Sequence, residues 1–225
     1  MEKLVQFPNK TGAKTKKSRP RNTDGPKYFT AQQIKALRRT ARDAAALAQD
    51  KGRVTGIRDW MVIDLLTSTG LRVSEAADLR CGDVMAGYGE SAIWIRSGKG
   101  SVSGTVIIPE GLKRHLKWYI NWKEDRNEPT GPDDHIFIGQ RGPMTAQALQ
   151  QIVKKFLKRL GLYQRGKSTH ALRHSYAVEL YSRERDLRAV QKQLRHVSIQ
   201  STLVYADVTK EKIADQVKNL WGGNS

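Results

Sequence analysis

Side chains suited to phosphoryl chemistry gather in three short segments of the sequence. The candidates are Arg72 and Glu75 within residues 69–75, His170 and Arg173 within residues 170–174, and His196 and Tyr205 within residues 194–206. An arginine presents two parallel N–H donors to phosphate oxygens, and a tyrosine oxygen can attack phosphorus. Histidines can hydrogen-bond a phosphate or accept a proton near neutral pH. Together these residue types suit a transesterification at a phosphodiester bond.

A further candidate, Lys99, lies in the sequence Ser-Gly-Lys-Gly at 97–100. The flanking segments 92–96 and 105–109 are rich in β-forming residues, which predicts a hairpin with Lys99 at its tip. His170 and Arg173 are three residues apart in a segment predicted to be helical. Because such positions share one face of a helix, both side chains can point at one phosphate.

The motifs themselves are Thr-Gly-Leu-Arg-Val-Ser-Glu at 69–75, His-Ala-Leu-Arg-His at 170–174, and Leu-Arg-His-Val-Ser-Ile-Gln-Ser-Thr-Leu-Val-Tyr-Ala at 194–206. In wording and order they resemble the motifs of the tyrosine recombinases, or phage-type integrases, over well more than half of the chain. The resemblance implies the catalytic-domain fold of that family. It also implies a site-specific recombinase that cleaves and rejoins DNA without a metal, ATP or another cofactor.

The same resemblance assigns roles to the candidates. It implies an active-site set of Arg72, Lys99, His170, Arg173, His196 and Tyr205, with Glu75 as a supporting residue. Tyr205 is then the nucleophile that becomes joined to a 3′-phosphate, and Lys99 is the general acid for the leaving 5′-oxygen. The two arginines hold the phosphate and the two histidines assist.

Arg195 is a departure from the family pattern. The family usually has a small residue, often glycine, immediately before the histidine that corresponds to His196. We therefore expect the local backbone to differ here, while the role of His196 is retained.

Each candidate also has a structural interpretation of its own. Arg173 could pair with Glu179 or Asp186, His170 could cap a helix, and Tyr205 could lie in the core. Six matches in the right order favour the catalytic interpretation. A type IB-like DNA topoisomerase uses a similar set, and an inactive recombinase-like DNA-binding protein would keep the same shape, so both are alternatives.

Hydrophobic patterns predict a mainly α-helical fold with a small antiparallel β-sheet (α+β). Thr30 and Gln33 form a capping box before a helix that ends near Gly52. The next helix is almost wholly apolar and is expected at the centre of the fold. The predicted helices after the first cover residues 57–67, 74–79, 145–160, 169–182, 186–194, 198–204 and 209–221, and residues 135–138 could add a third strand.

Four aromatic residues, Trp94, Trp118, Tyr119 and Trp122, resemble platforms on which bases could stack. Their apolar neighbours favour packing in or against the core instead. We assign them no stacking role.

The composition points to a polyanionic partner. The chain has 225 residues, 40 Lys and Arg against 22 Asp and Glu, and a net charge of +18. Residues 1–27 have little to bury and are expected to form a flexible basic arm. The candidate DNA-binding residues there are Lys10, Lys14, Lys16, Lys17, Arg19 and Arg21. Double-stranded DNA is the predicted partner.

Cys81 is the single cysteine, which excludes a disulfide within the chain and suits a cytoplasmic protein that associates with DNA. The sequence has neither a signal peptide nor a run of about 18 apolar residues, so no membrane role is expected. Residues 28–225 are expected to form one catalytic domain, without the separate N-terminal core-binding domain of most family members. The apolar stripe of the 209–221 tail helix suggests self-association into a dimer or tetramer on DNA.

Overall fold

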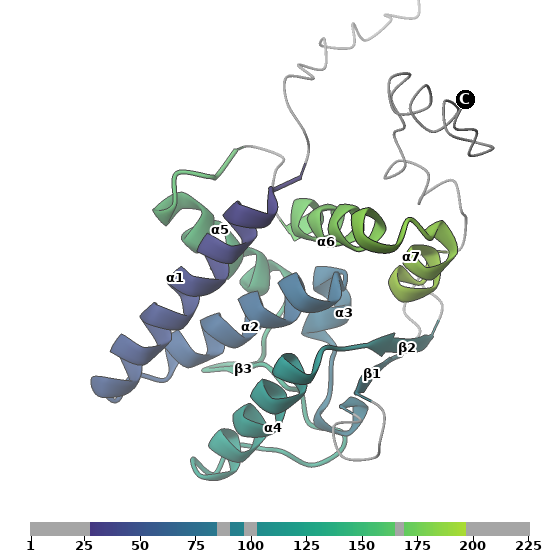
Figure 1. Cartoon of the computed structure of the whole chain (residues 1–225). Coiled ribbons are helices and arrows are strands. Elements are labelled where there is room, and N and C mark those ends of the chain that lie inside the picture. Colours follow the sequence, from purple (N-terminus) through teal and green to yellow (C-terminus); the bar gives the residue numbers. More distant parts are fainter. Residues whose placement is uncertain (1–27, 85–90, 97–102, 165–168, 197–225) are drawn as a thin grey trace, which may run out of the picture.

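The computed structural model describes residues 28–84, 91–96, 103–164 and 169–196, which form a mainly helical fold with two small antiparallel sheets (Figure 1). The predicted fold class is therefore confirmed. In chain order the elements are α1 (Ala31–Asp50), α2 (Thr55–Thr69), α3 (Val73–Ala77), the 3-10 helix η1 (Cys81–Asp83), β1 (Ala92–Ile95), β2 (Gly104–Ile107), α4 (Glu110–Glu124), β3 (Ile138–Gly139), β4 (Gly142–Pro143), α5 (Ala146–Arg159), α6 (Thr169–Glu184) and α7 (Leu187–Leu194).

Helix α1 begins as the sequence predicts. The Thr30 hydroxyl accepts a hydrogen bond from the Gln33 backbone N–H, and the Gln33 side chain accepts one from the Thr30 backbone N–H. This reciprocal pair satisfies two donors that an open helix end leaves without partners. Leu37, Ala41 and Ala45 then bury one face of α1 against the core.

Helix α2 lies at the centre of the fold, as its apolar sequence predicts (Figure 1). It packs against α1, α4, α5 and α6. Met61, Val62, Ile63 and Leu65 are fully buried. A helix with so many buried residues has to be surrounded by protein. This position fixes the end of α2, from which the candidate site begins.

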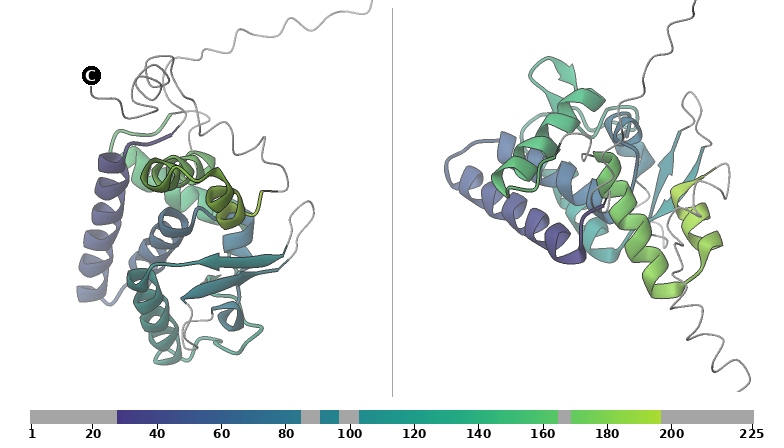
Figure 2. Two further views of the ribbon diagram at one scale, coloured as in Figure 1. Left: turned by 45° about the vertical axis from the view of Figure 1, so that its right-hand side comes forward. Right: turned by 90° about the horizontal axis from the view of Figure 1, so that it is seen from above.

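The predicted hairpin is present as β1 and β2. The two strands are antiparallel, with Ala92 opposite Ile107 and Ile95 opposite Gly104. Helix α7 packs against β2, and both views of Figure 2 show α7 beside this hairpin. The hairpin tip with Lys99 lies outside the described residues.

Two expectations were incomplete. Helix α4 was not predicted, although Leu112, Leu116 and Tyr119 follow a helical spacing and are all buried. The segment 135–138 does not add a third strand to the hairpin. Instead, β3 pairs with β4 in a sheet of its own, and His135 forms an isolated bridge with Arg80.

The other helices of the sequence analysis fare differently. Helices α5, α6 and α7 confirm the predictions for 145–160, 169–182 and 186–194 within two residues at each end. The predicted helices over 198–204 and 209–221, and the arm over 1–27, lie outside the described residues. In the part of the chain that is described, no helix combines the length and apolarity needed to cross a membrane.

Candidate active site

The site starts where α2 ends. Gly70 follows α2 in the left-handed conformation, with φ +65°, and its N–H donates to Leu66 O at 3.2 Å. A Cβ on Gly70 would lie 2.6 Å from Cδ1 of Tyr176. Glycine is therefore needed both for its backbone conformation and for the lack of a side chain. The turn leads directly into Arg72, the N-cap residue of α3.

Arg72 is bound twice by Glu75. Its backbone N–H donates to Glu75 Oε2 at 2.8 Å, and its Nη1 donates to Glu75 Oε1 at 2.9 Å. Burial raises the pKa of the Glu75 carboxyl, but the Arg72 backbone N–H and the positive charge of Arg195 outweigh it, so that the pKa is lowered. Glu75 is thus an anion at neutral pH, and it holds an Arg72 side chain that is still 37% exposed.

Arg173 connects the three motifs. It lies on α6, is 3% exposed, and donates from Nη1 to Gly70 O and from Nη2 to Leu194 O, both at 2.7 Å. Gly70 precedes Arg72 by two residues and Leu194 precedes His196 by two. One guanidinium therefore brings the ends of α2 and α7 together at α6.

Glu179 and Asp186, the two acidic residues with which Arg173 could have paired, bind other groups. Glu179 accepts a hydrogen bond from Arg183 Nη2 at 2.8 Å. The Asp186 side chain caps α7, accepting from the backbone N–H groups of Arg188 and Ala189.

His196 follows α7 and is partly buried. Its backbone N–H donates to Gln191 O at 3.0 Å, which fixes the residue to the last turn of the helix. Desolvation, then the positive charges of Arg173 and Arg72 and the neighbouring His170, lower the pKa of His196 to about 4. His196 is therefore neutral at physiological pH. His170 lies in the first turn of α6 and is exposed.

Arg195 is a site residue whose part sequence reasoning missed. It ends α7 in the left-handed conformation with φ +52° and ψ +47°, which glycine adopts most readily, so a glycine would suit this position. Its side chain is 6% exposed, and its Nη2 lies 2.5 Å from Glu75 Oε1. The signal in the sequence was the arginine itself, where the resembling family has a small residue.

A cavity of about 520 Å³ opens between α7 and the hairpin. Its lining residues are Trp94, Ser103, Gly104, Thr105, Arg188, Gln191, Lys192, Arg195 and His196. Trp94 is 43% exposed, so its prediction as a packing residue was only partly right, whereas Tyr119 is fully buried. The cavity places cationic side chains beside His196, a suitable environment for a phosphate.

Gln193 fastens α7 to β2 next to this cavity. Its side-chain amide donates to Ile107 O at 2.8 Å and its oxygen accepts from Ile107 N at 3.2 Å. The same amide nitrogen lies 3.0 Å from the Tyr176 hydroxyl on α6. The hairpin that leads to Lys99 is thus joined to the helix that leads to His196.

The structure therefore brings Arg72, Glu75, Arg173 and His196 together, with His170 close enough to affect the pKa of His196. Lys99, Tyr205 and the basic residues of the arm lie outside the described residues. Within the described ranges, no group of three or more His, Cys, Asp or Glu side chains could hold a metal ion.

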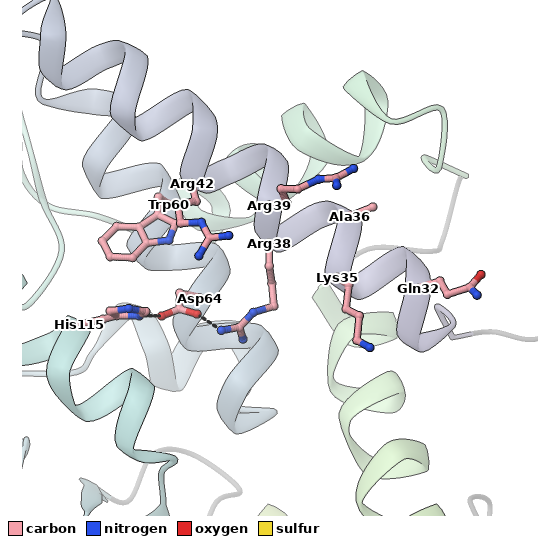
Figure 3. Close-up of a pocket in the computed structure, with 9 residues that line it drawn as sticks. All are labelled: Gln32, Lys35, Ala36, Arg38, Arg39, Arg42, Trp60, Asp64 and His115. Atoms are coloured by element: carbon pink, nitrogen blue, oxygen red, sulfur yellow. Dashed lines mark hydrogen bonds and ion pairs between the residues drawn. The ribbon is translucent and has the colours of Figure 1, made fainter.

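A second charged cluster lies between α1, α2 and α4 (Figure 3). Asp64 on α2 is 2% exposed, forms an ion pair with Arg38 of α1, and lies 2.7 Å from Nδ1 of His115 on α4. The Trp60 ring packs edge-on against His115, with centroids 5.0 Å apart. Lys35, Arg39 and Arg42 line the adjacent cavity of about 470 Å³.

Comparison with known proteins identifies the family. The sequence pattern of the phage integrase family matches residues 27–212. This chain belongs to the phage integrase family. The match includes every motif from which the resemblance to tyrosine recombinases was inferred, and the fold and the arrangement of Arg72, Arg173 and His196 agree with it.

Individual relatives are tyrosine recombinases. Tyrosine recombinase XerC of Nitrobacter winogradskyi is 33% identical over 183 residues, which cover 81% of this chain and 56% of that protein. Tyrosine recombinase XerA of Pyrococcus furiosus is 30% identical over 205 residues, covering 88% of this chain and 65% of the relative. The chain therefore spans somewhat more than half the length of these relatives.

The fold is also found in solved structures. XerH site-specific recombinase bound to its difH substrate in a pre-cleavage complex superposes with a TM-score of 0.69 at 25% identity, covering 85% of this chain and 54% of that one.

Proposed function

We propose that this chain is a tyrosine-type site-specific recombinase that cleaves and rejoins DNA strands through a 3′-phosphotyrosine intermediate at Tyr205. The observation that carries the proposal is the convergence of Arg72, Arg173 and His196 at the ends of α2, α6 and α7. Phage integrase family membership and the relatives named as tyrosine recombinases support it.

The two arginines hold the scissile phosphate. A guanidinium has five N–H donors, and Arg173 uses two of them on backbone carbonyls that carry no net charge. Its positive charge and its other donors are thereby directed by the fold without being neutralised by those two partners. Arg72 is held by Glu75 and remains partly exposed, so its free donors can bind the non-bridging oxygens.

The reaction exchanges one phosphodiester for another. The Tyr205 oxygen attacks phosphorus, His170 accepts the phenol proton, and the bond to the 5′-oxygen breaks while Lys99 protonates that oxygen. A 5′-hydroxyl from a second strand then attacks the phosphotyrosine and releases Tyr205. Because the intermediate conserves the phosphodiester bond energy, neither ATP nor a metal is needed.

His196 contributes as a neutral group. With a pKa of about 4 it carries no charge at pH 7, and it can donate one ring N–H to a phosphate oxygen. The charge that stabilises the transition state then comes from the guanidiniums, and His196 acts by orientation.

The partner that we propose is double-stranded DNA in the cytoplasm. The exposed side chains of Arg188 and Lys192 extend the cationic surface of the site along α7. We further propose that the arm over 1–27 binds the DNA backbone through its six basic residues. The 209–221 segment would link two or four copies on DNA, so truncation after Lys210 should abolish cooperative assembly while single-site binding persists.

Covalent capture tests the function. The chain is incubated with fragments of the source genome that carry a nick close to each potential cleavage site, so that a cleaved end cannot be rejoined. Protein that stays attached to 3′ ends after denaturation is isolated and the ends are sequenced. We expect a defined set of sites and a linkage at Tyr205.

Two variants control for the attachment. Tyr205→Phe removes the nucleophile and should abolish the adduct, whereas Tyr163→Phe removes a hydroxyl from a residue four positions after α5 and should leave it unchanged. An adduct that persists in Tyr205→Phe would contradict the proposal. Relaxation of supercoiled DNA that carries no paired sites, at multiple turnover by the monomer, would indicate a topoisomerase instead.

A further inference from the structure

Arg195 occupies a backbone position that opposes a long side chain. Its φ of +52° lies in the left-handed region. Glycine adopts this region readily, whereas L residues adopt it at a cost in free energy. Such conformations persist where surrounding contacts hold the residue in place, and they concentrate at functional sites. The contacts of the Arg195 side chain therefore need a physical account.

The side chain reaches the carboxylate that holds Arg72. Arg195 Nη2 lies 2.5 Å from Glu75 Oε1. The same oxygen accepts a hydrogen bond from Arg72 Nη1 at 2.9 Å. Glu75 Oε2 is bound by the Arg72 backbone. Arg195 thus fixes the oxygen to which the Arg72 guanidinium is attached.

The path of the side chain also involves the hairpin. A Cβ built on Gly104 would lie 3.2 Å from Cδ of Arg195, so the arginine stem packs closely over the β2 backbone. One side chain consequently contacts α3 and β2 from the end of α7. Arg72 is the N-cap residue of α3, Lys99 lies between β1 and β2 in the sequence, and His196 follows α7.

Charge gives the contact a second consequence. Glu75 is ionised, and alone with Arg72 it would make a pair without net charge. The addition of Arg195 leaves this group of three with a net charge of +1. A transition state in which negative charge spreads over the phosphate oxygens is favoured by that excess.

We propose that Arg195 is a positioning residue: its guanidinium holds the Glu75 carboxylate so that Arg72 faces the scissile phosphate, and it preserves the positive charge of the site. The proposal deepens the proposed function and rests on it.

The chain offers a matched control in Arg185. This residue follows α6, has φ +56°, and is exposed. Arg185→Gly and Arg195→Gly relieve the same kind of backbone strain and remove the same side chain. They differ in that only the second removes a buried side chain, with its contacts to Glu75 and to Gly104 of β2.

The experiment measures single-turnover cleavage on the captured substrate, together with DNA affinity and the urea midpoint of unfolding. We expect Arg195→Gly to lower the cleavage rate by about tenfold to a hundredfold. Residues that orient the ligands of a catalytic metal have effects of this size, and Arg195 would orient Arg72 in a similar way. The DNA dissociation constant should change by less than about threefold, since backbone phosphate contacts elsewhere dominate affinity. Arg185→Gly should cleave at the wild-type rate.

Chemical rescue distinguishes positioning from helix capping. Added guanidinium ion can occupy the space beside Glu75 in Arg195→Gly, so millimolar guanidinium should restore part of the cleavage rate. It should have no such effect on Arg185→Gly. A wild-type rate in Arg195→Gly, a faster one, or an equal loss in both glycine variants would overturn the proposal.

A measurement without catalysis separates this proposal from the proposed function. If the wild-type chain forms no adduct with any fragment, the proposed function fails. A double-mutant cycle then tests the role of Arg195 separately: urea midpoints are measured for the wild type, Arg195→Gly, Glu75→Gln and the double variant. We expect the two substitutions to be strongly non-additive because their side chains are in contact. Additive midpoints would show that Arg195 does not hold Glu75.

Discussion

Two buried carboxylates, Asp64 on α2 and Glu75 on α3, each bind arginine, but the surrounding charges are arranged differently. Asp64 lies between Arg38 and His115, which come from α1 and α4, so the histidine is bonded to the carboxylate (Figure 3). At Glu75 the neighbouring histidine, His196, instead has its pKa lowered, first by burial and then by the positive charges of Arg173 and Arg72. The first cluster joins three helices, whereas the second keeps a surplus of positive charge.

The anchors of the arginines explain the difference. Arg38 donates to the hydroxyls of Thr67 and Ser68 and pairs with the charge of Asp64. Arg173 instead donates to two backbone carbonyls. The carboxylates that bind Arg38 and Arg72 carry a charge opposite to that of the guanidinium. The two carbonyls that bind Arg173 orient its guanidinium without a net charge of their own.

Removing one arginine from each cluster is the strongest test of this comparison. Arg173→Ala should lower the cleavage rate about a hundredfold to a thousandfold, the usual loss for one transition-state donor. Arg38→Ala should leave the rate per folded molecule within about twofold, because a structural ion pair contributes through stability. Both expectations are checked by single-turnover cleavage rates, divided by the folded fraction that circular dichroism gives for each variant.

Arg173→Lys guards against misfolding in this test. Arg173→Ala leaves two buried carbonyls without a partner, at about 1–3 kcal/mol each, and could unfold the chain. Lysine keeps a positive donor but lacks the planar pair of N–H groups. A folded Arg173→Lys that cleaves as fast as the wild type would show that Arg173 serves only to join α2, α6 and α7.

Loss of the two carboxylates, Asp64 and Glu75, should affect stability in both cases but cleavage only in the second. Asp64→Asn should lower the free energy of unfolding by about 1–3 kcal/mol, since it removes the charge that pairs with Arg38 and one of the oxygens at which Arg38 and His115 are bound. The loss stays below that of a fully buried pair because both partners are 38% exposed. Glu75→Gln should cost at least as much stability, because it leaves Arg195, whose side chain is 6% exposed, without its carboxylate. It should also lower the cleavage rate, which Asp64→Asn should not. Urea unfolding together with cleavage rates measures this, and equal profiles for the two variants would remove the distinction.

Local patterns explain which parts of the fold were predictable. The Thr30–Gln33 capping box and the apolar sequence of α2 act within one helix, so the sequence contains their whole signal. Helix α4 was not predicted, because only Leu112, Leu116 and Tyr119 mark its apolar face, among charged and aromatic residues that could also belong to a stacking surface. The pairing of β3 with β4 depends on a two-residue turn, too short for a periodic signal.

The sequence predicts the candidate site as a set of residues but does not predict the groups that anchor them. The motifs give Arg72, Arg173 and His196, because their spacing is fixed within each segment. The hydrogen bonds of Arg173 to Gly70 and Leu194 join residues separated by 103 and 21 positions, and they go to backbone oxygens that every residue possesses. No side-chain pattern can reveal such partners. Arg195 was visible only as a departure, without its direction toward Glu75.

The pH dependence of stability sharpens the comparison at the histidine of the site. In the unfolded chain His196 has a pKa near 6.5, and in the fold its pKa is about 4. Between these values the unfolded state binds the proton and the folded state does not, so stability falls as pH falls from about 6.5 to about 4. His196→Asn should remove part of this slope.

The window between pH 4.5 and 6.5 is the cleanest for that measurement. The pKa of Glu75 is lowered from 4.5, so its contribution is present above that value and is lost only at lower pH. Urea midpoints of wild type and His196→Asn at several pH values in this window give the two slopes. Identical slopes would mean that His196 is protonated in the fold as easily as in the unfolded chain.

The smallest effect is expected at the histidine of the structural cluster. His115→Gln should lower the free energy of unfolding by about 0.5–1.5 kcal/mol, the net value of one hydrogen bond, because Asp64 keeps its pair with Arg38. A matched control is His135→Gln, where Nε2 lies 3.7 Å from an Asp78 side chain that is 66% exposed, so that water replaces the contact at almost no cost. If both variants lose the same stability, the bond between His115 and Asp64 contributes nothing specific, and Arg38 alone connects Asp64 to the rest of the fold. A loss confined to His115→Gln, without a change in cleavage rate, would place this histidine among the groups that hold α1, α2 and α4 together rather than among those that act on the phosphate.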